Sequence, residues 1–422
     1  MGRKRVTTIV RMEIKMDNIL IIGAGDFQLP LVQRASKSYN VYLAAPVISD
    51  AFTPYIKGSL LIDVRDKDAI LAFAREHSIC GVTTDQTDIA VRSVAYVAEQ
   101  LGLPGIGYET GVLFTDKSLM RTRMAELGIK LLPNRTVTSL EEALSYYEEI
   151  GGDVIIKPLD TQGSRGVQVC CSAAELTAKY AEAARWSSNH EVIVERFATG
   201  REFVVEGLAV DYEFRNLCIG DTLYFDLPDA FAAKSRIFPT LADDALAQRV
   251  LDLNTRIITG FGLKQGITHS EFIMDGDEIY LIETAARGGG VFISSDLISL
   301  SSGLDTEGFL LDIATGKQNG LPTIKPQQCV CGYLAFYIPT GKVVRVEGVK
   351  EVQALPYVHR NQLSKLQVGK ENKEGHTDKT SRLALIVSAP DRETFNQRAA
   401  QIRQMLQVET ETADGIKPLI WE

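Results

Sequence analysis

Two acidic residues, Glu271 and Glu283, stand on either side of the turn Asp275-Gly276-Asp277, which predicts a β-hairpin. A three-residue loop over 275–277 pairs Met274 with Glu278. It places both glutamates on one face, a diagonal step apart, whereas a two-residue loop places them on opposite faces. Neighbouring carboxylates repel each other unless a cation lies between them, and Mg²⁺ prefers such oxygen ligands. The alternative interpretation is two solvent-facing strand acids.

Lys157 ends the apolar strand 153–157 and is followed by the polar loop TQGSRG at 161–166. Glycines let backbone N–H groups approach phosphate oxygens, and the lysine supplies a positive charge. The loop is not a Walker A motif, because the spacing and the GK[ST] ending are absent. Phosphate binding and a solvated hairpin are both consistent with this pattern.

Arg287 follows the second acidic strand and precedes three glycines, Gly288, Gly289 and Gly290. An arginine at this place can bind two phosphate oxygens at once, and the glycines leave the backbone free to come close. A turn with a surface arginine is the alternative.

An earlier glycine turn, Gly23-x-Gly25-x-x-Gln28, lies between a buried strand and a helix. This context is typical of dinucleotide-binding proteins, but Gln28 replaces the third glycine. The next strand ends in Ala44-Ala45 and offers no acid for a ribose hydroxyl. We therefore expect a tight packing turn that faces a substrate at most, and no nicotinamide nucleotide.

Three units are expected along the chain. Strands alternate with helices over residues 17–112, which predicts a parallel, doubly wound α/β domain. Residues 113–315 read as an α+β unit with antiparallel strands, and residues 316–422 as a further α+β unit. The polar stretch 367–381 predicts a mobile loop, and residues 1–15 an extension without a structural role.

Composition excludes several classes of protein. The net charge of −9 argues against a protein that grips nucleic acid by its phosphates. Six cysteines without a CxxC pair, and no secretory segment, favour a reduced cytoplasmic protein. The sequence has no run of about 18 apolar residues, so no membrane span is predicted. The oligomeric state is left open, with a homodimer as one option.

The order of the motifs resembles the ATP-grasp superfamily. The matching segments are TDKSLMR, IIKP with its glycine loop, VIVERFATGREFVVEG, THSEF and LIETAARGGG. The similarity covers residues 17–315 well and the last third loosely. It is nearest to the carboxylate–amine ligases, especially bacterial L-amino-acid (dipeptide) ligases, and more distant from biotin carboxylase and glycinamide ribonucleotide synthetase. It implies a Rossmann-like pre-ATP-grasp domain, an ATP-grasp fold and a C-terminal α+β cap.

The resemblance also implies a set of residues that contact ATP: Lys117, Lys157, Gln162, Gly163, Ser164, Arg165, Gly166, Glu195, Arg196, Phe197, Ala198 and Glu202. Lys117 and Lys157 would hold the phosphates, and the loop 161–166 would close over them. Residues 195–198 would form the hinge that reads adenine, and Glu202 would bind the ribose hydroxyls.

By the same resemblance, Glu271 and Glu283 would bind Mg²⁺, and Arg287 would act in catalysis with Lys157 by stabilising the transferred phosphoryl group. Many relatives have Asn where this chain has Ala285, which leaves a second Mg²⁺ open. His269 shares a strand face with Glu271. It is either a packed neutral side chain or a residue that supports the site or contacts substrate.

The function implied is that of an ATP-dependent carboxylate–amine ligase, a C–N bond-forming enzyme that acts on small molecules through an acyl phosphate and releases ADP and phosphate. One alternative is an enzyme that uses bicarbonate, such as a carboxylase or a carbamoyl-phosphate-synthetase-like enzyme. Another is a nucleotide-binding regulator with weak catalysis, which Ala285 favours and the remaining charged residues oppose.

Overall fold

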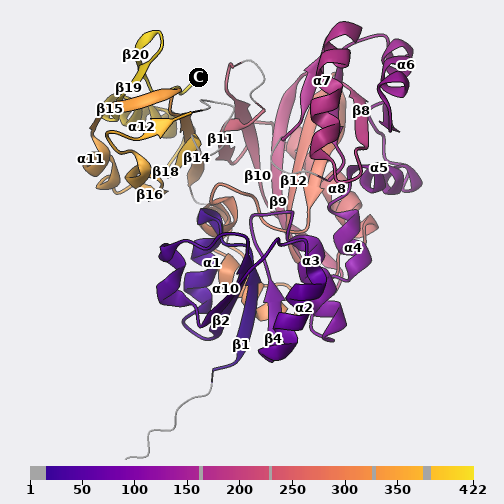
Figure 1. The fold of residues 1–422 in the computed structure, drawn as a ribbon, viewed down its shortest axis with the longest axis vertical. Coiled ribbons are helices and arrows are strands. Elements are labelled where there is room, and N and C mark those ends of the chain that lie inside the picture. The colour runs from indigo at the N-terminus through magenta and orange to yellow at the C-terminus, as the bar shows by residue number, and fades with distance from the viewer. Residues whose placement is uncertain (1–15, 161–164, 228–230, 326–328, 374–381) are drawn as a thin grey trace, which may run out of the picture.

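The computed structural model of the protein describes residues 16–160, 165–227, 231–325, 329–373 and 382–422. Four β-sheets organise them into an N-terminal unit, a central sheet, a small lobe and a C-terminal unit (Figure 1). None of the helices in these ranges combines the length and apolar composition that a membrane span needs.

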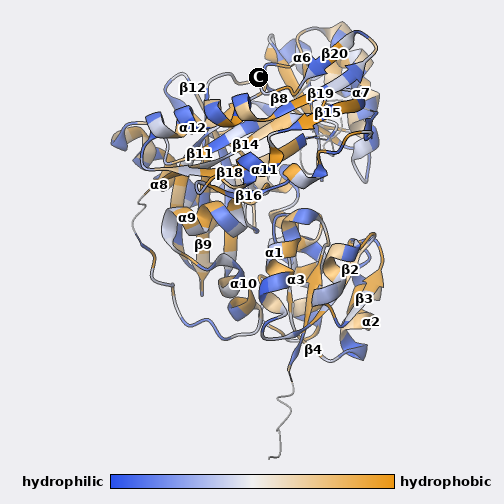
Figure 2. Cartoon of the chain, turned by 90° about the vertical axis from the view of Figure 1, so that its left-hand side faces the viewer, coloured by the Kyte–Doolittle hydropathy of each residue, from blue (hydrophilic) through white to orange (hydrophobic). Residues whose placement is uncertain are grey.

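A parallel four-stranded sheet forms the N-terminal unit, in the order β3-β2-β1-β4. Its strands are β1 (Asn18–Ile22), β2 (Asn40–Ala45), β3 (Gly58–Leu61) and β4 (Ile79–Thr83). Helices α2 (Lys67–Glu76) and α3 (Val91–Gln100) cover one face, whereas α1 (Leu29–Ala35) and α10 (Thr306–Ala314) cover the other. Figure 2 shows the hydrophobic strands of this sheet between helices with a hydrophilic side. The predicted doubly wound α/β fold is therefore confirmed.

An antiparallel sheet of eight strands forms the centre of the molecule, in the order β13-β12-β9-β10-β11-β14-β18-β16. Its strands are β9 (Arg201–Val210), β10 (Glu213–Tyr224), β11 (Ala233–Phe238), β12 (Gly266–Asp275), β13 (Glu278–Ala285), β14 (Val330–Tyr337), β16 (Val358–Asn361) and β18 (Arg382–Ala389). Helices α5 (Lys117–Glu126) and α8 (Asp244–Gly260) pack on one face, against Phe203 and Phe272 among others. Because side chains alternate along a strand, Glu202 and Glu206 of β9 point to the opposite face.

A small antiparallel sheet, β5-β8-β6-β7, forms a separate lobe. Its strands are β5 (Asn134–Val137), β6 (Val154–Pro158), β7 (Gln168–Cys170) and β8 (Val192–Arg196). Helices α6 (Leu140–Ile150) and α7 (Ala173–Trp186) cover it through a core of their own. This lobe carries Lys157, and α4 (Tyr108–Leu113) and α5 connect it to the N-terminal unit.

The C-terminal unit combines three strands of the central sheet with a fourth sheet, β17-β15-β19-β20. The strands of that sheet are β15 (Gly341–Glu347), β17 (Glu371–Asn372), β19 (Gln407–Thr412) and β20 (Gly415–Pro418). Its main helices are α11 (Val349–Gln353) and α12 (Arg392–Met405), which share a core with β14 and β18. The central sheet contains strands from both sides of residue 315, so it joins the second and third predicted units. The boundaries after residues 112 and 315 stay a prediction.

Candidate active site

The hairpin of β12 and β13 brings Glu271 and Glu283 directly opposite each other. The predicted three-residue loop is wrong, because Asp275 pairs with Glu278 and leaves a two-residue loop. A register shift next to Glu271 leaves Ile282 as an extra residue on β13, which is a β-bulge. The extra residue shifts the pairing of the rest of β13 by one residue. Glu283 therefore lies on the same face as Glu271, whereas a regular two-residue hairpin would place the two on opposite faces.

Glu283 is held by Lys117, whose ammonium group lies 3.1 Å from Glu283 Oε1. Lys117 is the first residue of α5, and the side chain of Asp116 caps that helix by accepting hydrogen bonds from the backbone N–H groups of Ser118 and Leu119. The cap fixes the start of the helix, so the nearly buried lysine is presented at a defined place.

Glu271 is held by Arg236 and His269. Its Oε1 accepts a hydrogen bond from Arg236 on β11 and lies 3.0 Å from His269 Nε2. Burial alone would raise the pKa of Glu271, but Arg236 and His269 outweigh it and hold this pKa far below its usual range. Glu271 is therefore an ionised carboxylate that the protein itself compensates with positive charge.

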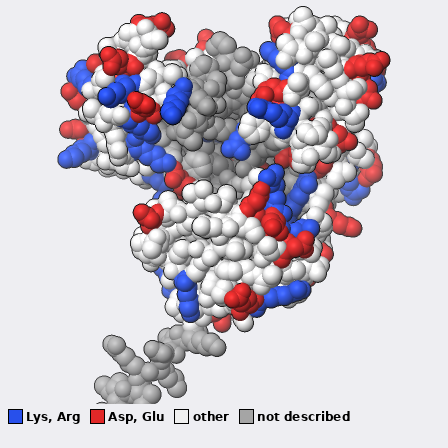
Figure 3. All heavy atoms as spheres, in the orientation of Figure 1, with Lys and Arg blue, Asp and Glu red and all other residues white. Residues whose placement is uncertain are grey.

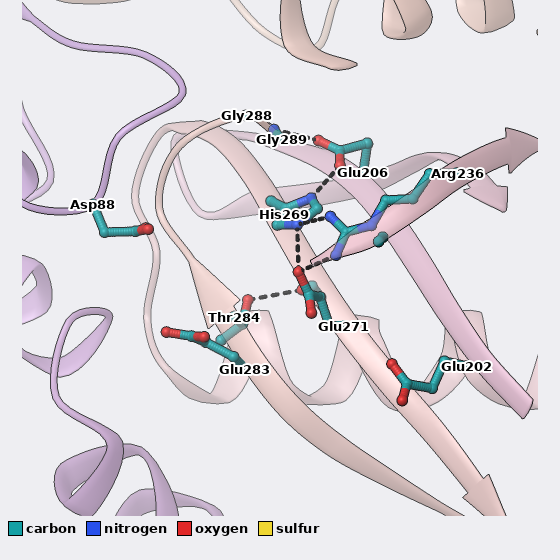
Figure 4. Close-up of polar contacts among 12 residues, drawn as sticks. Asp88, Glu202, Glu206, Arg236, His269, Glu271, Glu283, Thr284, Gly288 and Gly289 are labelled. Carbon is teal, nitrogen blue, oxygen red and sulfur yellow. Dashed lines mark hydrogen bonds and ion pairs between the residues drawn. The ribbon is translucent and has the colours of Figure 1, made fainter. Parts of the chain in front are cut away.

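Behind His269 lies Glu206, a fully buried carboxylate (Figure 4). Glu206 Oε1 contacts His269 Nδ1, and Glu206 Oε2 accepts a hydrogen bond of 3.0 Å from the backbone of Gly289. Burial lowers the pKa of His269, but Glu206 outweighs this effect and raises it. A Cβ atom at position 289 would lie 2.7 Å from the Glu206 carboxylate, so glycine is required for this close approach. His269 thus connects the buried Glu206 to Glu271, and its role at the site stays a prediction.

Glu202 lies further along the same face of β9, and the Tyr224 hydroxyl donates a 2.6 Å hydrogen bond to it. Burial raises the pKa of Glu202 to about 7; the Tyr224 hydrogen bond opposes this shift and the charge of Glu271 adds to it. The carboxyl group is therefore poised to change its charge near neutral pH.

Lys157 and Arg121 enclose Glu195 in the small lobe. Lys157 Nζ lies 2.6 Å from Glu195 Oε2, and Arg121 Nε lies 2.7 Å from Oε1. Burial would raise the pKa of Glu195, but the two cations lower it to about 2. The Lys157 ammonium is thereby anchored at the end of β6, where phosphate binding was predicted.

Arg287 reaches the N-terminal unit. Its Nε and Nη2 donate hydrogen bonds of 2.8 Å and 2.7 Å to the two oxygens of Asp88, and Nη1 donates to the Gly288 carbonyl. Burial lowers the pKa of the guanidinium, and the Asp88 carboxylate more than restores it. The neighbouring Gly288 N–H donates to Asp85, so the loop after β4 and the glycine turn are joined at successive residues.

The N-terminal glycine turn closes on itself. Gln28 Oε1 accepts a 2.7 Å hydrogen bond from the Gly25 backbone, and Gln28 Nε2 donates to the Asp85 carbonyl. Because Gln28 occupies the Gly25 N–H, this group is not open to a phosphate. The geometry agrees with the expected packing turn.

Lysine and arginine side chains lie on the sides of the C-terminal unit and of the small lobe that face each other (Figure 3). Glu202, Glu206, His269, Glu271 and Glu283 belong to one face of β9, β12 and β13, as their strand register shows. The candidate site is therefore a sheet face of acidic side chains, which Lys117 of α5 and Arg236 of β11 contact with positive charge.

Comparison with known proteins agrees with this geometry. Residues 116–212 match the family described as carbamoyl-phosphate synthase L chain, ATP binding domain. An alanine–anticapsin ligase of Bacillus subtilis is 26% identical over 280 residues, which are 60% of this chain and 58% of that protein. The aligned part thus spans little more than half the length of that relative.

Solved structures cover almost the whole chain. The L-amino acid ligase of Bacillus licheniformis has a TM-score of 0.78 at 21% identity and covers 94% of this chain and 99% of its own. The biotin carboxylase domain of a Hydrogenobacter thermophilus 2-oxoglutarate carboxylase, solved with MgADP, has a TM-score of 0.74 at 17% identity and covers 96% of this chain and 92% of its own. This chain has the ATP-grasp fold. The predicted fold class is confirmed.

The predicted phosphate loop is described only in part. Gln162, Gly163 and Ser164 lie outside the described residues. Arg165 lies over the ring of Trp186, and Gly166 also packs close to that ring.

The predicted adenine hinge runs from the end of β8 to Ala198. The Arg196 guanidinium pairs with Asp275, and the Phe197 N–H donates to the Asp153 carbonyl. Ala198 is buried in a small cluster with Ile273. The individual roles of the hinge residues stay predictions.

Sequence reasoning missed four residues of the site: Asp88, Glu206, Arg236 and Arg121. Glu206 carried a signal, because it interrupts an otherwise apolar strand, FVVEGLAV. Arg236 did as well, in the alternating stretch AKSRIF, where a charged residue falls on one face. Asp88 lies in the loop TTDQTD, whose partner is about 200 residues later, so no local pattern indicates its contact.

Proposed function

We propose that the protein is an ATP-dependent carboxylate–amine ligase that forms an acyl phosphate and then an amide. The observation that carries this proposal is the pair of opposed carboxylates, Glu271 and Glu283, which Lys117, Arg236 and His269 compensate on one sheet face. A sheet face with this many acidic side chains serves no packing purpose, and it suits a bound cation with phosphate oxygens. The similarity to alanine–anticapsin ligase and L-amino acid ligase supports an amine as the second substrate.

Mg²⁺ fits these residues by the chemistry of the donors. Glu271 and Glu283 offer hard carboxylate oxygens from neighbouring strands, and ATP phosphates would complete the ligand set. The contacts of Lys117 with Glu283 and of Arg236 with Glu271 support a place that attracts positive charge. When bound, Mg²⁺ would neutralise charge on the phosphate oxygens. Ala285 supplies no further ligand, which favours a site built on two protein carboxylates.

ATP would lie between the small lobe and the central sheet. Lys157 at the end of β6 and Lys117 at the start of α5 would hold the phosphates, while Glu202 would accept hydrogen bonds from the ribose hydroxyls. In the first step, a substrate carboxylate oxygen attacks the γ-phosphorus, which forms an acyl phosphate and releases ADP. In the second step, an amine attacks the acyl carbon, phosphate leaves, and the amine loses a proton.

Arg287 would stabilise the transferred group. Charge spreads over the oxygens of the phosphoryl group during transfer, and a planar guanidinium can bind two of them. The carboxylate needs this activation because a free carboxylate does not react with an amine at neutral pH.

The test is a phosphate-release screen with ATP, Mg²⁺ and a matrix of amino acids and other small carboxylates. We expect release that requires both a carboxylate and an amine, together with ADP and a new amide seen by mass spectrometry. Release that requires bicarbonate alone would favour the carboxylase alternative. A rise in melting temperature with NAD, and none with Mg-ATP, would contradict the proposal at the level of nucleotide binding.

A further inference from the structure

The loop after β4 holds the glycine turn of Arg287 through several bonds. Asp85 accepts from the Gly288 N–H at 3.1 Å, and the Gln86 side chain accepts from the Phe292 N–H at 2.9 Å. Asp88 instead contacts the side chain of Arg287. These contacts place a loop of the N-terminal unit against the end of the candidate phosphate site.

The pairing of Asp88 with Arg287 is bidentate and well shielded from water. Only 15% of the Asp88 side chain and 13% of the Arg287 side chain are exposed. Two parallel N–H···O bonds fix both the position and the rotation of a guanidinium, which a single bond does not. Arg287 therefore has its orientation set by a residue about 200 positions earlier in the chain.

The guanidinium still has donors to spare. It carries five N–H groups. Within the described part of the chain, Asp88 takes those of Nε and one of Nη2, and the Gly288 carbonyl takes one of Nη1. One N–H on Nη1 and one on Nη2 remain. Arg287 can thus bind an anion while Asp88 still holds it.

We infer that Asp88 is a positioning residue for phosphoryl transfer, which orients Arg287 so that its remaining N–H groups bind the transferred phosphoryl group. The inference rests on the proposed function. It means that the N-terminal unit contributes to the chemistry although its own glycine turn is closed. The loop that carries Asp88 follows the carboxyl end of β4, the edge at which α/β sheets bind their ligands. A substrate held there would lie next to the residue that sets the arginine.

The decisive variant is Asp88→Asn. The amide presents N–H groups to one side of the guanidinium, so the bidentate pairing is lost while size and shape are kept. We expect kcat to fall about 10-fold to 100-fold, the range seen when a partner that orients a functional group is removed. The Kd of Mg-ATP should stay within about two-fold, because other residues hold the nucleotide.

A double-mutant cycle separates positioning from a merely structural role. If Asp88 acts through Arg287, Asp88→Asn should have no further effect on kcat in an Arg287→Ala background. Asp88→Glu retains the charge and should restore part of the rate. The control is Arg34→Gln, which breaks another arginine–carboxylate pair, with Asp305, and should leave kcat unchanged.

The possible outcomes separate a failure of the role of Asp88 from a failure of the proposed function. An active wild type with an unchanged Asp88→Asn variant overturns the role of Asp88 alone, as does a loss that persists undiminished without Arg287. A loss of rate that follows a fall in melting temperature, with no partial recovery in Asp88→Glu, also overturns it. A wild type that neither binds nucleotide nor releases phosphate overturns the proposed function and the inference with it.

Discussion

Two glycine turns follow strands in this chain, and their environments differ. In the N-terminal turn, the Gly25 N–H is bound by Gln28 of the same turn, a neutral and local partner. In the later turn, the N–H groups of Gly288 and Gly289 are bound by carboxylates from other elements, Asp85 and Glu206. The later turn belongs to the candidate site because ionisable groups from distant elements bind its N–H groups. Glycine content alone does not distinguish the two turns.

The largest expected effect comes from removing one carboxylate beside the later turn. Glu271→Gln or Glu283→Gln should lower kcat by about 10³-fold, the factor that a loss of about 4 kcal/mol in transition-state stabilisation produces. Circular dichroism should show an unchanged fold. Glu278→Gln in the same hairpin is the control, since the Glu278 side chain pairs with Lys130 at the exposed surface. Normal turnover in the Glu283 variant would remove the metal site from the proposal.

Arg287→Lys tests the turn itself. Lysine keeps the charge but cannot bind two oxygens in one plane, so kcat should fall about 10²-fold, which corresponds to about 3 kcal/mol. Nucleotide Kd, measured by titration calorimetry on the same variant, should change little. A Kd that weakens in proportion to the rate would mean that Arg287 binds ATP in its ground state and has no special role in transfer.

Glu206→Gln breaks the support of the later turn. A glutamine can accept only one of the two hydrogen bonds that Glu206 now accepts from His269 and Gly289, so a buried donor is left without a partner. We expect the free energy of unfolding to fall by about 1–3 kcal/mol in urea titrations. Wild-type stability in this variant would show that the buried network is not what holds the turn.

Glu202 should make stability depend on pH in the protein without nucleotide and Mg²⁺. Its folded-state pKa of about 7 lies above the ordinary value of 4.5, so the folded state binds the proton more tightly. Its contribution is therefore present at pH 5 and is lost as the pH rises through 7. We expect the free energy of unfolding of the wild type to fall by roughly 2 kcal/mol more than that of Glu202→Gln between pH 5 and pH 8. Parallel curves would contradict the raised pKa.

The smallest effect is expected at the N-terminal turn. Gln28→Ala removes local hydrogen bonds and should lower stability by about 1 kcal/mol, with unchanged nucleotide Kd and kcat. Thermal unfolding and the phosphate-release assay on one preparation measure both. A loss of nucleotide affinity would show that this turn, too, takes part in binding, and the contrast between the two turns would fail.

The sequence predicted the elements whose patterns are local. The buried strands of the N-terminal unit and Lys157 at the end of a strand were found from apolar runs and their boundaries. The shared face of Glu271 and Glu283 was predicted for the wrong reason, since the loop is shorter and a bulge at Ile282 corrects the register. A bulge depends on how a strand meets its neighbours, which a pattern of alternating residues does not reveal.

The contacts that complete the site were not predictable in this way. Arg236 contacts Glu271 directly from β11, a strand that is distant in the chain. Glu206 is connected to Glu271 through His269. Asp88 finds Arg287 because α10 returns to pack on the N-terminal sheet and brings the later turn with it. Such pairs follow from topology, and a single sequence carries no record of them.

The continuity of the central sheet has a mechanical consequence. Strands β11 and β14 are joined by a regular antiparallel ladder from Ser235–Leu334 to Phe238–Cys331, so the face that carries the candidate site and the C-terminal strands form one stiff sheet. Bending between them would break backbone hydrogen bonds that have no replacement in the interior. The small lobe has its own sheet and its own core. We therefore expect the small lobe to move as one body relative to the central sheet, with the segments that flank α5 as the hinge.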